Sequence, residues 1–300
     1  YDEKMVFPDG NAEPAGDDAF MVKTAQKMYH EISPETGEFI DFMIDHELMD
    51  LQNKPGKAST GYMTSLPSLK APFVFSCFNH TIFDMQVLTH ELGHAFAGYM
   101  AMRSQPISDY YSETTDIAEI HSMSMEQFAY PYAEWFFGDQ ADKFRFAHLQ
   151  EALTFVPFGV AVDEFQHICY AHPELTPKER TYRWHLLEEK YMPWRRYEND
   201  PFMERGGYWY HKLHIYLYPF YYINYTLTTM GAMEFKKKYA EDKSAAWQDY
   251  LKLCKTGGSR SYLETLRYAN LANPFEAGSV ERACGYAEKI LLDEIAKQAK

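Results

Sequence analysis

Two histidines and a glutamate stand at the spacing of a metal site near residue 90. Residues 87–96 read VLTHELGHAF, with His90, Glu91 and His94 at the centre. On a helix, residues four positions apart share one face, so both imidazoles can reach a single ion while Glu91 lies beside it. This geometry suits zinc. Because short matches of this kind also arise by chance, histidines packed in a helical core are an alternative that other evidence must exclude.

A third ligand has to come from outside this segment. Some zinc proteases carry a further histidine six residues after the second one, but Met100 occupies that place here. The helical stretch 114–122 offers the carboxylate of Glu119 instead. Two imidazoles and one carboxylate leave a fourth position for water, which is the pattern of a catalytic zinc site and not of a closed structural one. We therefore expect His90, His94 and Glu119 to bind one zinc ion and to serve hydrolysis.

The neighbouring carboxylates differ in what they could do. Glu91 adjoins His90 and cannot easily bind the same ion, but it can accept the proton of a zinc-bound water and return it to a leaving amine. Asp116 and Glu126 lie near the same helical face as Glu119, where either could orient a ligand imidazole. Glu126 fits a plain structural hydrogen bond equally well, and for Asp116 the structural role is favoured.

The elements that must position these residues are expected to be mainly helical. Ser33 and Pro34 have the form of an N-cap and a first helical residue. Thr176 and Glu179 form a capping box around Pro177. A last helix is expected to start at Ser279.

The stretch 56–79 is the main exception to helical spacing. Turn residues there separate the polar segment 61–65 from the run 73–78, which has the length and composition of a strand. The sequence thus predicts a mainly α-helical protein in which a small β-sheet precedes the helix that carries the two histidines. We expect residues 1–300 to form a single domain.

Composition limits the partners of such a site. The chain has 300 residues, of which 46% are hydrophobic and 24% charged, as in ordinary globular proteins. No stretch approaches the ~18 uninterrupted apolar residues that a membrane-spanning helix needs. The formal net charge of −14 would repel a phosphate backbone. We therefore expect neither a nucleic acid nor a membrane as a partner.

The cysteines indicate the compartment. Cys77, Cys169, Cys254 and Cys284 are far apart in sequence and form no C-x-x-C pair, which argues against a disulfide framework and against a thiolate zinc site. A reducing compartment follows, and no signal or transit segment is visible. The expectation is a cytoplasmic protein, for which an oligomer is possible.

Several segments together resemble the thimet oligopeptidase and oligoendopeptidase F family of zinc metallopeptidases, especially its oligoendopeptidase F branch. The separation of His94 and Glu119 matches that family, and so do Ser122 and Glu126 after the third ligand. Further matching segments are 165–167, 213–216, 219–225, 257–259 and 273–275. These motifs cover nearly the whole chain.

The resemblance implies a zincin-like, mostly helical catalytic domain with one zinc ion per chain. It further implies a metalloendopeptidase of the oligopeptidase type, whose substrates are short unstructured peptides cleaved inside a deep channel. Family members also carry a helical amino-terminal lobe that walls this channel, and the present chain is expected to lack it.

The resemblance also points to groups that would act on the substrate. His214 and Tyr225 fall where the family places donors to the scissile carbonyl and its oxyanion, and a preorganised donor there stabilises charge that appears only in the transition state. Tyr216 fits the site and the protein core equally well. Gly61 and Tyr62, with the run 73–78, are expected to form the edge strand on which a peptide lies extended.

A rival interpretation comes from another class of protein. Glu91 and His94 form one E-x-x-H pair and Glu164 and His167 a second, in the order found in di-iron carboxylate helix bundles. That interpretation leaves His90 without a role and does not account for the strand-like segment. A catalytically inactive scaffold that only binds peptides is disfavoured because Glu91 is present.

Overall fold

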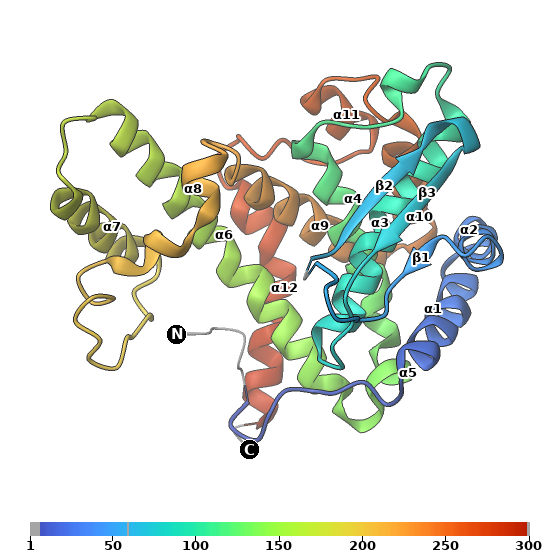
Figure 1. The fold of residues 1–300 in the computed structure, drawn as a ribbon, viewed down its shortest axis with the longest axis horizontal. Helices are drawn as coiled ribbons and strands as arrows, with labels where there is room; N and C mark the ends of the chain where they lie inside the picture. Colours follow the sequence, from blue (N-terminus) through green and yellow to red (C-terminus); the bar gives the residue numbers. More distant parts are fainter. Residues whose placement is uncertain (1–6, 59, 299–300) are drawn as a thin grey trace.

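The protein is described by a computed structural model that covers residues 7–58 and 60–298 (Figure 1). It consists of helices around one small sheet. The helices are α1 (Asp18–Ile32), α2 (Pro34–Asp45), α3 (Phe83–Ser104), α4 (Thr115–Ala129), α5 (Ala133–Phe137), α6 (Ala141–Ala171), α7 (Pro177–Tyr191), α8 (Leu213–Leu217), α9 (Ile223–Glu241), α10 (Lys243–Thr256), α11 (Tyr262–Tyr268) and α12 (Ser279–Gln298). The strands are β1 (Met49–Asp50), β2 (Tyr62–Leu66) and β3 (Ala71–Phe75).

The helix starts expected from the sequence are confirmed. The Ser33 hydroxyl accepts the Thr36 N–H at 3.1 Å, and Pro34 is the first residue of α2. At the start of α7, the Thr176 hydroxyl accepts the Glu179 N–H at 3.3 Å, while the Glu179 carboxylate accepts the Thr176 N–H at 2.8 Å. These bonds satisfy backbone donors that have no partner inside the helix.

The small sheet precedes α3 in the sequence, as predicted. Its strand order, however, differs from the expectation that the run 73–78 forms an edge strand. The strand order is β1-β3-β2, with β3 parallel to β1 and antiparallel to β2. The run 73–78 therefore contributes the central strand, which ends at Phe75, and cannot be the edge. The polar segment forms β2, which is an edge strand. Alternate residues of β2 are exposed, whereas Ala71 and Val74 of β3 are buried. The polar strand is therefore the exposed one and the apolar strand the buried one.

The main hydrophobic core packs α3 and α4 against α9 and α10. Phe96, Phe128, Phe235 and Tyr250 are fully buried at their meeting point. The ring of Phe128 meets that of Tyr250 edge to face, with 4.9 Å between centroids. Aromatic pairs of this kind add specific geometry to apolar burial. Long helices are thereby fixed around the segment that carries the two histidines.

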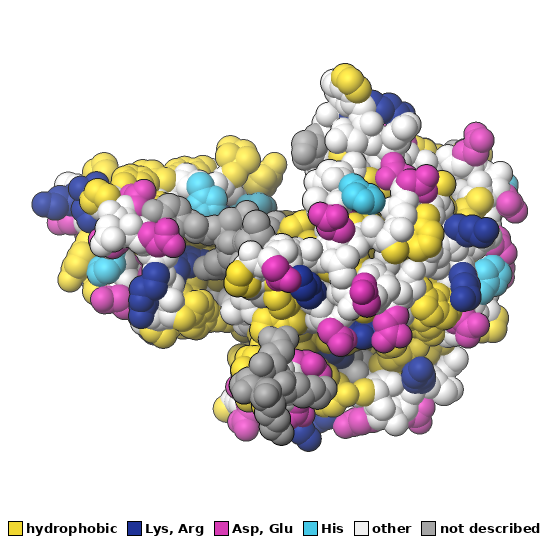
Figure 2. All heavy atoms as spheres, turned by 90° about the horizontal axis from the view of Figure 1, so that it is seen from below, with side chains coloured by type: hydrophobic (Ala, Val, Ile, Leu, Met, Phe, Trp, Pro, Cys, Tyr) yellow, Lys and Arg dark blue, Asp and Glu magenta, His cyan; other side chains and the backbone are white. Residues whose placement is uncertain are grey.

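A second, smaller core lies in the arm, by which we mean residues 160–218 with the end of α6, α7 and α8. Trp184 and Phe165 are fully buried there, with ring centroids 5.3 Å apart. The arm stands apart from the rest of the molecule in Figure 1, and in Figure 2 hydrophobic side chains gather along its edge. Among the described residues, no helix combines the length and apolar character needed to cross a bilayer.

Candidate active site

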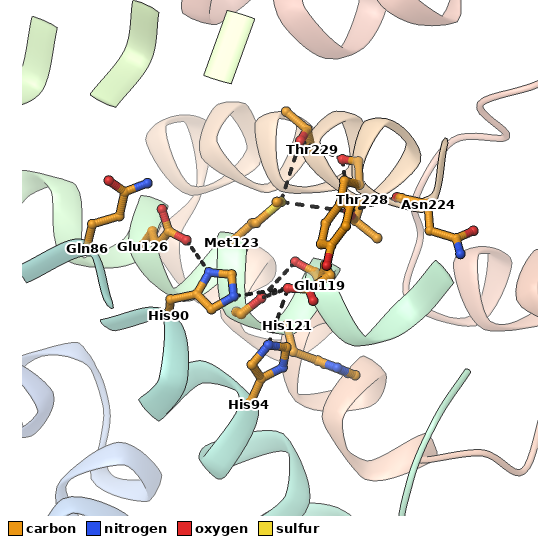
Figure 3. A network of polar contacts seen from close by, with 12 residues as sticks. Gln86, His90, His94, Glu119, His121, Met123, Glu126, Asn224, Thr228 and Thr229 are labelled. Atoms are coloured by element: carbon orange, nitrogen blue, oxygen red, sulfur yellow. Dashed lines mark hydrogen bonds and ion pairs between the residues drawn. The ribbon is translucent and has the colours of Figure 1, made fainter. Parts of the chain in front are cut away.

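The three predicted ligands converge where α3 and α4 pack together. His90 and His94 stand one turn apart on α3, and Glu119 faces them from α4 (Figure 3). The Glu119 Oε2 atom lies 3.0 Å from His90 Nε2 and 3.3 Å from His94 Nε2. One donor atom from each residue lies within 4.8 Å of the other two. No other trio of histidine, cysteine or carboxylate side chains converges in this way among the residues that the structure describes.

A glycine allows the two helices to approach this closely. A Cβ atom on Gly93 would lie 2.7 Å from the Cα of Ser122 and 2.9 Å from the Cβ of Met125. Real Cβ atoms are not found that close to a backbone atom. Ser122 also donates a hydrogen bond of 2.9 Å from its hydroxyl to Glu119 Oε2. Gly93 therefore sets how closely α4 approaches the two histidines, and Ser122, on α4 itself, sets the orientation of the Glu119 carboxylate.

The donor set fits a single zinc ion. Two imidazoles and one carboxylate are the protein ligands of open zinc sites. Burial alone would raise the pKa of the Glu119 carboxyl, but hydrogen bonds and charge from His90 and His94 hold that pKa well below its usual range. Burial would lower the pKa of His90, yet Glu119 and Glu126 raise it well above its usual value. A site that holds a proton this firmly is also attractive to a metal cation.

Glu91 is close to the ligands but does not join them. It is 7% exposed, and its Oε2 atom has no hydrogen-bond partner among the described residues. Burial raises the pKa of this carboxyl, although the two histidines oppose the shift. On its other side lies Gly61, where a Cβ would be 3.0 Å from Glu91 Oε1. A buried, unpaired carboxylate next to a cation site is the arrangement expected of a general base.

Glu126 binds the ring nitrogen of His90 that does not face Glu119. Its Oε1 atom accepts a hydrogen bond of 2.6 Å from His90 Nδ1, and its Oε2 atom one of 2.6 Å from His148 Nε2. Burial would raise the pKa of Glu126, but these two histidines lower it. A carboxylate in this position fixes the orientation of a ligand imidazole. Asp116 instead accepts a hydrogen bond from the Thr114 hydroxyl at the start of α4, which is a structural contact.

Sequence reasoning missed His148. This residue is 5% exposed on α6, and its ring stacks on Phe144 with 5.4 Å between centroids. A lone histidine on an apolar helix face carries no local spacing signal. The only available signal was Glu126 itself, since a buried carboxylate requires more than one partner.

His214 and Tyr225 approach the site from α8 and from the start of α9. Their rings are perpendicular, with 6.1 Å between centroids. Burial and the nearby Tyr221 hydroxyl raise the pKa of Tyr225, so its hydroxyl keeps the proton. Burial and Lys212 lower the pKa of His214. Both side chains are thus neutral donors near neutral pH.

Other predicted residues lie around the site in different ways. Gly61 directly precedes β2, which begins at Tyr62, and the Tyr62 ring is 47% exposed and stacks on Phe75. Tyr216 is 49% exposed and stacks on Trp209 within the arm, with 5.7 Å between centroids. The structure therefore brings Gly61 next to Glu91, whereas Tyr216 packs against another residue of the arm.

A cavity of about 280 Å³ adjoins the ligands on the side of His90. His214 and Tyr225 line it together with His90, and its walls are largely apolar. The apolar wall residues include Met123, Ala152, Phe155 and Met233. A volume of this size accommodates an apolar amino-acid side chain.

The di-iron alternative does not fit the described geometry. Glu164 accepts a hydrogen bond of 2.8 Å from Lys190 on the arm. His167 is exposed and pairs with Asp163 at 3.4 Å. This second E-x-x-H pair therefore does not face the first one, whereas His90, which the di-iron interpretation leaves without a role, lies with His94 and Glu119.

Comparison with known proteins extends these observations. The sequence model of peptidase family M3 matches residues 22–285. A curated relative, the oligoendopeptidase F homolog of Borreliella burgdorferi, is 25% identical over 229 residues, which are 75% of this chain and 38% of that protein.

Solved structures resemble the chain over almost all of its length. Pz peptidase A, solved with an inhibitor, has a TM-score of 0.90 and 49% identity over 98% of this chain and 52% of its own. A chain from Bacillus anthracis has a TM-score of 0.82 and 44% identity over 96% of this chain and 48% of its own. The chain thus spans about half the length of these solved relatives.

Proposed function

The chain belongs to peptidase family M3, and from that premise we propose that it is a zinc-dependent endopeptidase that hydrolyses short unstructured peptides. The observation that carries the proposal is the convergence of His90, His94 and Glu119 beside an unpaired, buried Glu91. The four free cysteines support a reducing compartment such as the cytoplasm.

His90, His94 and Glu119 would hold the zinc ion, one per chain. When bound, zinc would polarise the scissile carbonyl and lower the pKa of a water molecule toward about 7. Glu126 keeps His90 in the tautomer whose Nε2 faces the ion, because the Nδ1 proton is donated to the carboxylate. The Ser122 hydroxyl orients the Glu119 carboxylate by donating a hydrogen bond to it.

Glu91 would serve as the general base. Its free carboxylate oxygen accepts the proton of the attacking water and then passes that proton to the amine that leaves when the peptide bond breaks. The position of Gly61 beside Glu91 leaves room there, since a side chain at residue 61 would contact the carboxylate.

His214 and Tyr225 would stabilise the negative charge on the carbonyl oxygen. Both are neutral donors and belong to the lining of one cavity with His90. Donors of this kind act in the transition state because charge develops only there.

The substrate would lie extended along the free edge of β2. Main-chain hydrogen bonds with an edge strand are tolerant of sequence and require a backbone that is not already paired. The cavity of about 280 Å³ would take the side chain of the residue that flanks the scissile bond next to His90. A folded protein does not offer such a backbone, so short peptides are the expected substrates.

The proposal is tested with the purified chain, its zinc content measured first. A peptide of about ten residues, casein and a folded globular protein are incubated with it, and the products are mapped by mass spectrometry. We expect cleavage of the peptide that stops on chelation and returns with added zinc. Efficient digestion of the folded protein without prior unfolding, or cleavage unaffected by the chelator, would contradict the proposal.

A further inference from the structure

The chain reverses sharply between the two groups proposed to bind the oxyanion. α8 is five residues long and ends where the Tyr218 N–H bonds to the carbonyl of His214 at 2.9 Å. Pro219 follows and has no N–H with which to continue the helix. Phe220 then adopts a φ of +60°, a strained conformation that a phenylalanine rarely takes. This reversal brings His214 back against Tyr225.

A glutamine from another helix supports the strained residue. The Oε1 atom of Gln166, on α6, accepts the Phe220 N–H at 2.9 Å. Gln166 is 1% exposed, and its Nε2 atom donates to the carbonyl of Val162 on its own helix at 3.4 Å. A buried amide left without these partners would destabilise the folded protein, because its polar atoms would be removed from water without compensation. The bond therefore ties the turn to the long, well-packed α6.

Two side chains of the turn are exposed. Tyr218 is 56% exposed and Phe220 is 37% exposed. The Phe220 ring rests on His167 and Tyr170 with centroid distances of 4.9 and 5.0 Å, and both of these residues are also on α6. α8 has no side-chain cap at its start. The hydrogen bond from the Phe220 N–H to the buried Gln166 side chain therefore joins the backbone of this reversal to α6, next to the buried Tyr222 ring at the end of the turn.

We propose that Gln166 is a positioning residue for catalysis. By holding the Phe220 backbone, its amide oxygen keeps His214 and Tyr225 at the separation needed to share one oxyanion. This inference rests on the proposed function, because it acts through those two donors. A displacement of about 1 Å in such a pair can cost up to 10²-fold in rate.

The test compares two substitutions of similar size. Gln166→Met keeps the volume but removes the acceptor, so kcat should fall about tenfold or more with KM nearly unchanged. Gln166→Glu keeps an acceptor for the Phe220 N–H, so this variant should retain most of the turnover of the wild-type protein. Gln26→Met is the matched control, because Gln26 makes a 2.7 Å side-chain bond to Asp41 between α1 and α2. It should lower the melting temperature while kcat per folded molecule stays the same.

A double-mutant cycle separates positioning from plain stability. In a Tyr225→Phe background the oxyanion donor is already lost, so Gln166→Met should reduce kcat by clearly less than in the wild type. Equal effects in the two backgrounds, or an unchanged kcat in Gln166→Met, would overturn the positioning role.

Hydrogen exchange of the Phe220 amide tests the hydrogen bond without using activity. Exchange should become faster in Gln166→Met and stay slow in Gln166→Glu, and unchanged exchange in Gln166→Met would overturn the inference. Faster exchange with an unchanged kcat would remove only the positioning role. Absence of peptide cleavage by the wild-type protein with zinc would instead refute the proposed function.

Discussion

The two halves of the site are built in opposite ways. The metal half, with His90, His94 and Glu119, sits where two helices of 22 and 15 residues cross through Gly93 in the main core. The oxyanion half consists of the five-residue α8, the turn 218–222 and the first turn of α9. Many of its residues are more exposed than those of the metal half, and Phe220 has a backbone conformation in the left-handed region.

Because of this difference, we expect the metal half to be rigid and the oxyanion half to be easier to displace. His90, His94 and Glu119 are fixed by core packing, which deforms little, because interiors are close-packed. His214 and Tyr225 pack against Tyr222. A strained turn with a hydrogen bond to Gln166 holds them in place, and it can shift at lower cost. We therefore expect substitutions in the metal half to remove the metal or the fold, and substitutions in the oxyanion half to change turnover in a folded protein that still contains zinc.

The largest effect is expected from His94→Ala in the metal half. Loss of one of three protein ligands should release most of the zinc, a larger change than the ~10–100-fold weakening seen when an outer hydrogen-bond partner of a metal ligand is removed. Elemental analysis of the purified variant measures it. His167→Ala, which alters an exposed histidine paired with Asp163, is the control and should retain full zinc. Full zinc in His94→Ala would remove the proposed metal site.

Tyr225→Phe is the corresponding change in the oxyanion half. It deletes one donor used mainly in the transition state, so kcat should fall ~10²–10³-fold while KM changes little. Zinc content should stay intact. Tyr182→Phe, at an exposed position on α7, provides the control. If kcat is unchanged and only the melting temperature falls, Tyr225 is a core residue and His214 becomes the main candidate donor.

Two glycines of α3 test whether the helix crossing sets the metal half. Gly93→Ala should separate α3 from α4 and lower the free energy of unfolding by ~1–3 kcal/mol, with weaker zinc binding. At Gly98, the nearest atom to an added Cβ is Met63 Cε at 3.5 Å, which is ordinary contact. Gly98→Ala should therefore raise stability by ~0.5–1 kcal/mol. Denaturant unfolding with zinc titration measures both, and equal effects of the two substitutions would contradict the crossing argument.

The smallest effect concerns the cavity that the two halves share. Ala152→Phe should partly fill it, so that kcat/KM falls about tenfold for peptides with a bulky residue beside the scissile bond. Peptides with glycine at that position should be cleaved as before. Ala171→Phe, exposed at the end of the same helix, serves as the control. A uniform loss across all peptides would show that the cavity does not select the substrate.

The sequence was informative where chemistry and local spacing coincide. The i, i+4 histidines and the helix starts at Ser33 and Thr176 depend on neighbours along the chain, and the structure forms those helices as predicted. The roles of the ligands and of Glu91 stay predictions until they are measured. Family membership is confirmed, as is the mainly helical fold with a small sheet.

Contacts between distant segments were beyond sequence reasoning. The run 73–78 has the apolar composition of a buried strand, and the structure uses it as the central strand of the sheet. We had expected an edge strand, because composition alone does not show which strands pair on either side. His148 reaches Glu126 from another helix, 22 positions along the chain. The support of Phe220 by Gln166 spans 54 positions. None of these pairs has a characteristic spacing, because tertiary packing alone brings them together.

Kinetics of Glu91→Gln in protein with verified zinc content tests the proposed role of Glu91 as the general base. The substitution keeps the shape of the side chain and all three proposed ligands but removes the base. We expect one zinc per chain, an unchanged fold by circular dichroism and almost no peptide hydrolysis. Turnover close to that of the wild-type protein, with zinc in place, would contradict it.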